Sequence, residues 1–211
     1  MLWNVLTWVG DHPRVFWQAA SQHLALSAAA LAAATAIALP LAVLLVRWPW
    51  ASGLAIGLVN VLRTIPSLAL LVILLPVLGT GFSPSLVALI LYGLPAVLIN
   101  AYAGLRGVDP DIIEAARGQG LSQRQITRRI EIPLALPVIF AGIRTAAVQV
   151  VSAATLAAFI GGGGFGELIT SGMGMLDIPQ LLAGGLAVAA LAFATELAFG
   201  LCERLLHARI A

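Results

Sequence analysis

Few side chains in this sequence could carry out covalent or metal chemistry. Cys202 is the single cysteine, so the chain can form no internal disulfide and no cysteine-based zinc site. The three histidines, His12, His23 and His207, lack the spacing of metal ligands. All eleven basic residues are arginines, and without lysine the chain can supply neither a Schiff-base amine nor a P-loop lysine. We therefore predict no catalytic residue, no metal site and no cofactor bound by this chain.

A run of glycines, residues 161–164, followed by Phe165, Gly166 and Glu167, is compatible at first sight with a phosphate-binding loop. No predicted strand precedes the run, and the chain has no lysine to complete such a loop. We interpret it instead as a tight backbone turn that glycine permits.

Polar side chains recur inside two long apolar segments. Thr145, Gln149 and Ser152 are spaced i, i+4 and i+7, which places them on one face of a helix. Such a stripe either lines a translocation cavity or makes hydrogen bonds between helices, as Ser, Thr and Gln commonly do in membrane bundles. The candidate path residues are Tyr92, Asn100, Thr145, Gln149, Ser152 and Thr155.

Arg144 and Glu196 each lie inside an apolar segment, several residues from the end predicted to face the cytoplasm. At ~1.5 Å per residue, both fall in the inner half of a bilayer. Charges at that depth are costly and normally pair or face the protein interior. We predict that these two form a structural salt bridge, and that Arg63 snorkels towards an interface.

The elements that position these residues are predicted to be membrane-spanning helices. Of 211 residues, 61% are hydrophobic and 9% charged, against about 25% charged in soluble domains. This excludes a soluble enzyme, a disordered linker and a nucleic-acid-binding domain. A span needs roughly 20 apolar residues, and five segments satisfy this: 24–46, 52–78, 83–105, 134–160 and 181–201. The second could be an interfacial piece followed by a broken helix. The fold class is thus an all-α polytopic membrane protein with about five transmembrane helices.

Residues 1–22 have a different character from the rest of the chain. They contain Trp3, Trp8 and Trp17, and tryptophan favours the headgroup zone of a membrane. We predict an interfacial helix on the outer face for this segment, with a disordered tail as the alternative. Residues 23–211 are predicted to form one membrane domain.

The arginines are distributed unequally between the two sides of the membrane. With five spans, Arg14 lies on one side, and because basic residues favour the cytoplasm, the other side is predicted to be cytoplasmic. The N-terminus is then outside and the C-terminus inside. The arginines on the predicted cytoplasmic side are Arg47, Arg106, Arg117, Arg124, Arg128, Arg129, Arg204 and Arg209.

The largest predicted cytoplasmic loop spans residues 106–133. Asp109 followed by Pro110 is typical of a helix N-cap with proline at the first position, and Gly118 and Gly120 are C-cap candidates. The sequence therefore predicts a first short helix that ends at a glycine.

Ser122 and Gln125 form a capping-box pattern for a second short helix, with Arg128 and Arg129 in its last turn. Pro133 is expected to mark the turn back into the bilayer. The residues alone leave two interpretations open for this helical hairpin: a docking surface, or a re-entry loop with basic anchors.

The hairpin resembles the cytoplasmic signature of permease subunits of binding-protein-dependent ABC importers. That signature is E-A-A, three residues, Gly, and later Ile, one residue, an apolar residue and Pro; here Ile132 stands where the family usually has Leu. The matching residues are Glu114, Ala115, Ala116, Gly120, Ile130, Ile132 and Pro133. The stretches NAYAGLRGVDPDIIEAARGQG, LPVIFAGIRTAAVQ and AAFIGGGGFGELI are similar to the osmoprotectant subgroup, which imports glycine betaine, choline and related quaternary amines.

The resemblance implies a type I ABC importer permease in the inner membrane of a bacterium. The first loop helix would be a coupling helix, seated in a groove of a cytoplasmic ABC ATPase dimer that binds ATP and Mg²⁺. Glu114 would offer the ATPase a charge, Ala115 and Ala116 would permit close approach, and Gly120 would permit the turn. The other implied partners are a second permease copy or paralogue, and an extracytoplasmic substrate-binding protein near the glycine-rich outer loop.

The implied function is a translocation path for glycine betaine, choline or a related osmoprotectant delivered by the binding protein. One alternative is an importer permease for another small solute, such as an amino acid. A passive channel would lack the docking loop. An intramembrane enzyme would need a paired nucleophile and base, or a metal cluster, at membrane depth, and the sequence contains no such pattern.

Overall fold

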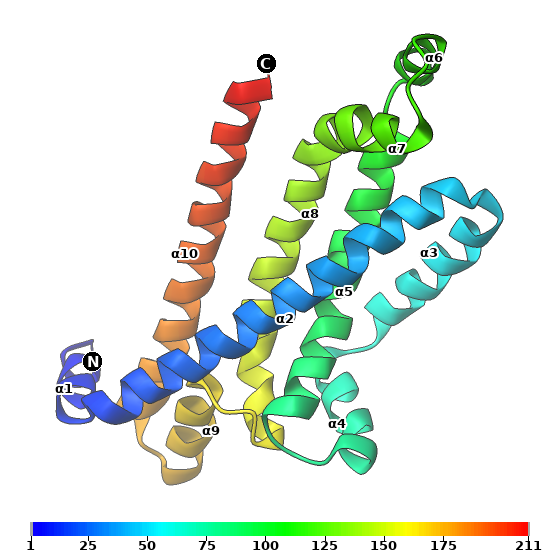
Figure 1. The fold of residues 1–211 in the computed structure, drawn as a ribbon. Coiled ribbons are helices and arrows are strands. Elements are labelled where there is room, and N and C mark those ends of the chain that lie inside the picture. The colour runs from blue at the N-terminus through cyan, green and yellow to red at the C-terminus, as the bar shows by residue number, and fades with distance from the viewer. Residues whose placement is uncertain (1, 211) are drawn as a thin grey trace.

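The computed structural model describes residues 2–210, and the side chains of residues 3–204. Its regular elements are all helices within that range. Figure 1 shows three of them side by side: α5 (Phe82–Arg106), α8 (Ile132–Ala153) and α10 (Ile178–Ile210). The long helix α2 (Pro13–Arg47) crosses this group obliquely and packs mainly on α5.

The prediction of about five spans is confirmed. Four helical segments are long and apolar enough to cross a membrane. The pair α3 (Pro49–Thr64) and α4 (Ser67–Leu78), bent by 98°, is a fifth when it is counted as one broken span. The bend falls at Ile65 and Pro66, where Ile65 is extended (φ −74°, ψ 123°). Proline disfavours helical backbone in the residue before it, which explains why the span breaks at this point.

The boundary predicted after residue 22 does not coincide with the end of a helix. Only α1 (Leu2–Asp11) is a separate element, because Pro13 occupies the first position of α2, which continues through residues 13–22. At ~1.5 Å per residue, α2 is roughly 50 Å long and exceeds a hydrocarbon core of about 30 Å. A helix of this length tilts or projects from the membrane, in keeping with its oblique path in Figure 1.

Small residues bring the helices of the bundle close together. On α2, four alanines at intervals of four residues are completely buried: Ala30, Ala34, Ala38 and Ala42. Between α5 and α8, a Cβ atom added at Gly142 would lie 2.5 Å from Cβ of Asn100 and 2.9 Å from the carbonyl oxygen of Ala96. Close backbone approach of this kind is how membrane helices gain packing energy without a hydrophobic driving force.

The predicted two-helix hairpin is only partly correct. The first helix is α6 (Pro110–Gly118), but α7 (Gln123–Ile126) does not end in the loop. It continues through a π-helical turn, Thr127–Glu131, directly into α8. Pro133 has no N–H to donate, and the π turn accommodates it, with Ile132 N–H donating to the Thr127 carbonyl. Pro133 therefore lies within a continuous helical run rather than at a turn.

The C-terminal end of the fourth span also differs from the prediction. After α8 the chain forms a 3₁₀ helix over Ala154–Ile160, so Thr155 does not continue the α-helical stripe of Ser152. The glycine turn that follows leads into α9 (Phe165–Met175), which packs on α10.

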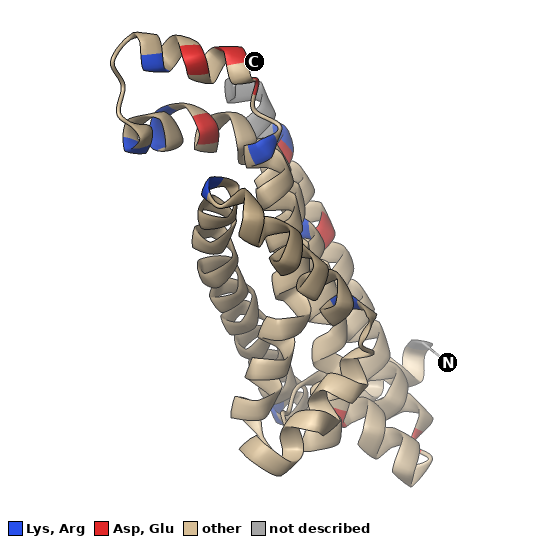
Figure 2. Ribbon diagram, turned by 90° about the vertical axis from the view of Figure 1, so that its right-hand side faces the viewer, with Lys and Arg blue, Asp and Glu red and all other residues tan. Residues whose placement is uncertain are grey.

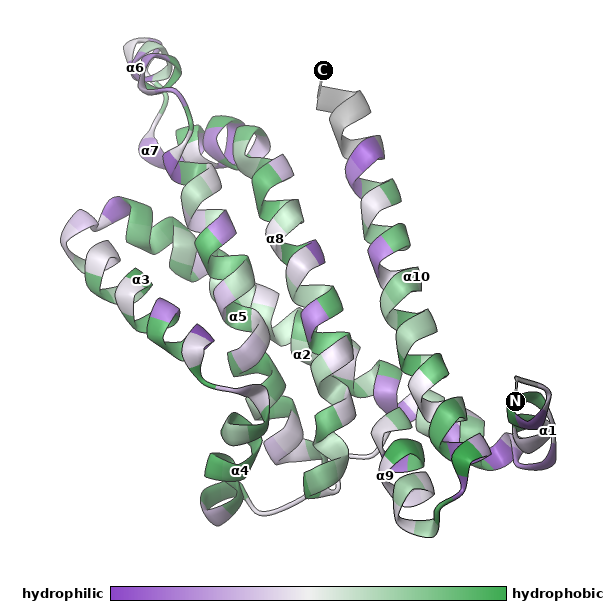
Figure 3. Ribbon diagram, turned by 180° about the vertical axis from the view of Figure 1, so that it is seen from behind, coloured by the Kyte–Doolittle hydropathy of each residue, from purple (hydrophilic) through white to green (hydrophobic). Residues whose placement is uncertain are grey.

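The charged residues are concentrated at one end of the molecule. Figure 2 shows most arginines and several acidic residues around the α6–α7 hairpin, and Figure 3 shows predominantly apolar helices between that end and the α9 end. The helix α1 lies near the α9 end, whereas α10 finishes towards the hairpin end (Figure 1). The beginning and end of the described chain thus lie at opposite ends of the bundle.

Candidate coupling surface and translocation path

The helix α6 is capped at both ends by its own sequence. The Asp109 carboxylate accepts a hydrogen bond from Asp111 N–H at 2.9 Å. At the other end, Gly120 has φ +81°, its N–H donates to the Arg117 carbonyl, and Leu121 N–H donates to the Ala116 carbonyl. This pair of hydrogen bonds is a Schellman motif, which requires a left-handed residue and explains the glycine. Capping at both ends presents α6 as a short, well-defined element outside the bundle.

The three residues of the E-A-A sequence have different surroundings. Glu114 and Ala115 are exposed, whereas Ala116 is buried at 5% exposure. Ala116 therefore serves the packing of α6 within this chain, and the exposed surface of α6 is offered by Glu114 and Ala115. At the start of α7, the Ser122 hydroxyl and the Gln125 side chain make the predicted reciprocal capping box.

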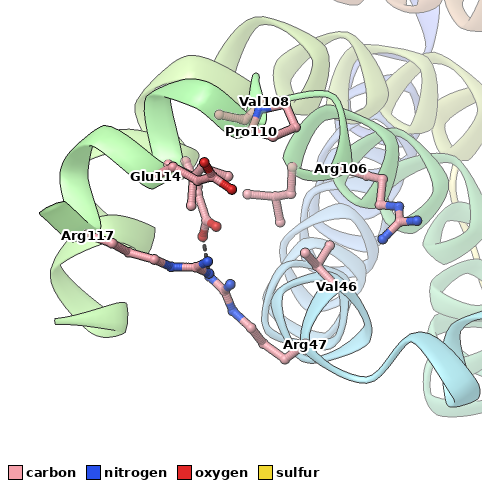
Figure 4. Close-up of a pocket in the computed structure, with 10 residues that line it drawn as sticks. Val46, Arg47, Arg106, Val108, Pro110, Glu114 and Arg117 are labelled. Atoms are coloured by element: carbon pink, nitrogen blue, oxygen red, sulfur yellow. Dashed lines mark hydrogen bonds and ion pairs between the residues drawn. The ribbon is translucent and has the colours of Figure 1, made fainter. Parts of the chain in front are cut away.

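A cavity of about 470 Å³ lies beneath α6, between it and the ends of α2 and α5. Glu114 and Arg117 of α6 line it together with Arg47 of α2, and Figure 4 shows these side chains around a common space. On the α2 side, the Arg47 guanidinium donates hydrogen bonds to the Thr127 hydroxyl and the Glu131 carboxylate. The hairpin is thus tied to the end of the first span.

The Arg47–Glu131 pair was absent from our sequence analysis. Its carboxylate is almost fully buried, with the Glu131 side chain 4% exposed and that of Arg47 28% exposed. Glu131 lies in the π turn that joins the hairpin to α8, so the ion pair connects α2, α7 and α8 at one point. Glu131 follows two arginines and precedes an apolar run, a position at which a carboxylate is expected to need a partner. Nothing in the sequence indicates that the partner is Arg47, 84 residues away.

The structure brings Arg144 and Glu196 together. Arg144 Nε donates to Glu196 Oε1 at 3.1 Å, and a second guanidinium nitrogen of Arg144 donates to the same oxygen. Glu203, which we had not considered, accepts from Arg144 Nη1 at 2.5 Å. Glu196 and Glu203 are seven residues apart and hence on one face of α10, a spacing from which the second partner could have been predicted.

The candidate path residues are only partly grouped. Thr145 and Ser152 are exposed on α8, and each hydroxyl donates at 2.9 Å to a carbonyl of the same helix. They therefore make no hydrogen bond between helices of this chain, the second role that we considered for them. Asn100 donates to the carbonyl of Ala96 at the tight crossing of α5 and α8, and the Thr155 hydroxyl is buried without a hydrogen-bond partner.

Two of the candidate path residues lie at the same cavity. Tyr92 of α5 and Gln149 of α8 line one cavity of about 130 Å³, together with Arg63 and Leu62 of α3. The rest of its lining is Pro95 and Ala96 of α5. The sequence indicated each of these polar residues separately, but only the fold places all three around the same space.

The glycine run forms the turn that we predicted. Gly161, Gly163 and Gly164 have φ values of +74°, +79° and +85°, which L-residues with side chains rarely adopt. Gly164 N–H donates to the Gln22 side chain at 3.1 Å, which fastens the turn to α2. Within the part of the chain that the structure describes, no three His, Cys, Asp or Glu residues come together as metal ligands.

Comparison with known proteins identifies the class to which this architecture belongs. Residues 34–210 match the family of binding-protein-dependent transport system inner membrane components. Because the match covers most of the chain, the protein belongs to that family and is a multi-pass membrane permease subunit.

The names of its relatives state which solutes those proteins transport. The chain is 42% identical over 182 residues to a carnitine transport permease of Listeria monocytogenes, covering 86% of this chain and 84% of that protein. It is 39% identical over 183 residues to a choline transport system permease of Bacillus subtilis (87% and 84%). It is 41% identical over 180 residues to an osmoprotectant import permease of Salmonella typhimurium (83% and 84%).

The fold is that of a type I ABC importer permease. A chain of the MetNI methionine ABC transporter in an inward-facing conformation superposes with a TM-score of 0.81 and 21% identity. The superposition covers 92% of this chain and 98% of that one. At this level of identity, the likeness concerns the fold.

Proposed function

We propose that this chain forms the translocation path of an ATP-driven importer for glycine betaine, choline, carnitine or a related osmoprotectant. The observation that carries the proposal is the set of relatives that share 39–42% identity along more than four-fifths of the chain and are named for such solutes. The chain itself carries no catalytic residue, and ATP and Mg²⁺ bind to a separate ABC ATPase dimer.

In this proposal α6 is the coupling helix and docks on the ATPase. Its exposed Glu114 and Ala115, together with the capped ends of α6, support this role, since a rigid helix with an exposed charge and a small residue can sit in a groove. ATP-driven closure of the ATPase dimer then moves α6. Binding shifts the permease between inward-open and outward-open states only if the contacts differ between those states.

The motion reaches the membrane through two connections. The first is the uninterrupted helical run from α7 through the π turn into α8. The second is the Arg47–Glu131 ion pair, which joins that turn to α2. Because Glu131 is buried, the two helices move with the hairpin rather than slide past it.

The same proposal fixes the orientation and the remaining partners. The hairpin end faces the cytoplasm because the arginines gather there, so the N-terminus is outside and the C-terminus inside. A second permease copy or a paralogue completes the path, and the exposed Thr145 and Ser152 on α8 line it. A substrate-binding protein docks at the opposite end, near the glycine turn and α9.

The substrate class is tested by uptake in a bacterial host that lacks its own osmoprotectant transporters. The full transporter, with its ATPase and binding protein, is expressed and supplied with radiolabelled glycine betaine. We expect uptake that unlabelled choline or carnitine reduces and methionine does not. Competition by methionine alone would favour the amino-acid alternative, and uptake that survives ATP depletion would favour a passive channel.

The docking role of α6 is tested by Glu114→Lys. Reversing this exposed charge is expected to abolish co-purification of the ATPase and to reduce uptake by at least tenfold, equivalent to about 1.4 kcal/mol. Asp111→Lys, at the start of the same helix, is the matched control for a charge change on α6. Undiminished co-purification of the Glu114→Lys variant would contradict the proposed docking surface.

A further inference from the structure

We infer that Arg63, Tyr92 and Gln149 form a solute-binding site at mid-membrane depth, with Arg63 as the residue that recognises a carboxylate. The three side chains line the 130 Å³ cavity between α3, α5 and α8. This inference rests on the proposed function and narrows it: it names the chemical feature of the solute that the membrane part itself selects.

Arg63 and Tyr92 lie at the same distance along their helices from the hairpin end. Arg63 is fourteen residues after Pro49, where α3 begins, and Tyr92 is fourteen residues before Arg106, where α5 ends. At ~1.5 Å per residue, each is about 21 Å from that end, well inside a hydrocarbon core of about 30 Å. Figure 1 accordingly shows α3 ending part-way down the bundle.

Arg63 has no acidic partner within residues 3–204, where side chains are described. The arginines of the three ion pairs in that range are Arg47, bound to Glu131, and Arg144, bound to Glu196 and Glu203. An arginine at membrane depth is costly and normally pairs or faces a polar cavity. Arg63 is exposed in the single chain and borders a polar cavity, which it shares with a phenol and an amide.

The backbone beside Arg63 supports the same conclusion. The helix ends at Thr64 and the chain turns by 98° at Ile65 and Pro66. Non-helical backbone at membrane depth is tolerated only where it is buried in protein or lines a wet cavity. Broken spans of this kind carry the binding sites of several transporter folds, which makes this break the natural place for one.

The chemistry of the three side chains matches a small zwitterion. A guanidinium binds a carboxylate through two parallel hydrogen bonds, and the face of a tyrosine ring attracts a quaternary ammonium group. The Gln149 amide can donate to the carboxylate as well. A cavity of about 150 Å³ accepts benzene. Glycine betaine is larger than benzene, so it would fill the 130 Å³ here and extend past the exposed Arg63. Choline carries the ammonium group but no carboxylate and would engage Tyr92 without Arg63.

The test measures uptake of labelled glycine betaine and labelled choline by the complete transporter carrying Arg63→Gln. We expect the ratio of glycine betaine to choline uptake to fall at least tenfold, and Arg63→Lys to recover part of it. Arg14→Gln is the matched control, because it removes an exposed arginine at the start of α2, away from the cavity. This variant should keep the wild-type ratio of glycine betaine to choline uptake. The amount of each variant in the membrane is measured alongside.

The outcomes separate this inference from the proposed function. A wild-type transporter that carries none of labelled glycine betaine, choline and carnitine overturns the proposed function. A wild-type transporter that carries them, with an Arg63→Gln variant that keeps the wild-type ratio, overturns the carboxylate site alone. If the wild type carries only a solute with a carboxylate, glycine betaine or carnitine, equal uptake of that solute by Arg63→Gln and Arg63→Lys likewise overturns it.

Tyr92 supplies a second measurement that does not depend on the folding of Arg63→Gln. Tyr92→Leu removes the ring and is expected to lower uptake of both solutes severalfold, because both carry the quaternary ammonium group. Tyr92→Phe keeps the ring and should retain most of the uptake. Equal uptake by the two Tyr92 variants would overturn the cation-binding half of the site.

Discussion

Two clusters of ionic side chains hold the helices of this permease together, and they differ in burial and in what they connect. The Arg47–Glu131 pair joins α2 to the π turn at the hairpin end, with a carboxylate that is 4% exposed. The Arg144–Glu196–Glu203 cluster joins α8 to α10, and its side chains are 22–43% exposed. Arg47 is the one described ion-pair partner of the Glu131 carboxylate, whereas Arg144 has two carboxylate partners, so the two clusters should respond unequally to the loss of one partner.

The largest effect is expected from Arg47→Met. It leaves the Glu131 carboxylate buried without its partner, at a cost of about 3–5 kcal/mol. We expect a clear fall in the thermal unfolding midpoint of the purified transporter, measured by intrinsic tryptophan fluorescence, and loss of uptake. Arg47→Met combined with Glu131→Leu should recover much of the midpoint, since an apolar pair can replace a buried ion pair.

Arg129→Met is the matched control for this experiment. Arg129 is exposed and forms no ion pair among the described side chains, so its loss should leave the midpoint nearly unchanged. If the unfolding midpoint of Arg47→Met equals that of this control, the Arg47–Glu131 pair does not contribute more to stability than the Arg144 cluster.

A smaller effect is expected from Glu196→Gln in the other cluster. Arg144 loses two hydrogen bonds to a carboxylate but keeps Glu203. The midpoint should fall by roughly a third or less of the fall seen with Arg47→Met, because Arg144 keeps its ion pair with Glu203 and no charge is left without a partner. Normal assembly and transport by this variant would show that the pair has no structural role.

The smallest effect is expected from Glu203→Gln. This change removes one hydrogen bond from Arg144 and leaves both bonds to Glu196 in place. The unfolding midpoint and uptake should stay closer to the wild type than those of Glu196→Gln. The reverse order would assign the main contact of Arg144 to Glu203 instead.

The contrast between the clusters also shows why one was predictable and the other was not. Arg144 and Glu196 are charges inside otherwise apolar segments. Because a charged side chain in a membrane costs free energy, the sequence alone predicts that each needs a partner. Arg47 and Glu131 sit at the ends of apolar segments, where charges are ordinary and indicate no particular partner. The same reasoning applies to Arg63, which the sequence marked only as a snorkelling residue and the fold places beside Tyr92 and Gln149.

In the hairpin, too, some features could be predicted from the sequence and others could not. The caps of α6 and the box of Ser122 and Gln125 depend on hydrogen bonds a few residues apart, and their pattern was sufficient to predict them. The continuation of α7 into α8 was not predicted, because a π turn absorbs the proline that would otherwise end a helix. The break between α3 and α4 was visible as Pro66 in an apolar segment, although its angle of 98° was not.

The sequence by itself determined that this chain spans a membrane about five times, that it belongs with importer permeases and that it carries a capped helix in its arginine-rich loop. The spans and the capped helix follow from composition, apolar length and hydrogen bonds between near neighbours, all of which act within a single segment. The place among importer permeases follows from the resemblance of the loop to the family signature. Only the tertiary structure decided which charges pair across helices and which polar groups share a cavity. Such contacts depend on the angles and depths at which separate helices pack, and those are set by the small residues at their crossings.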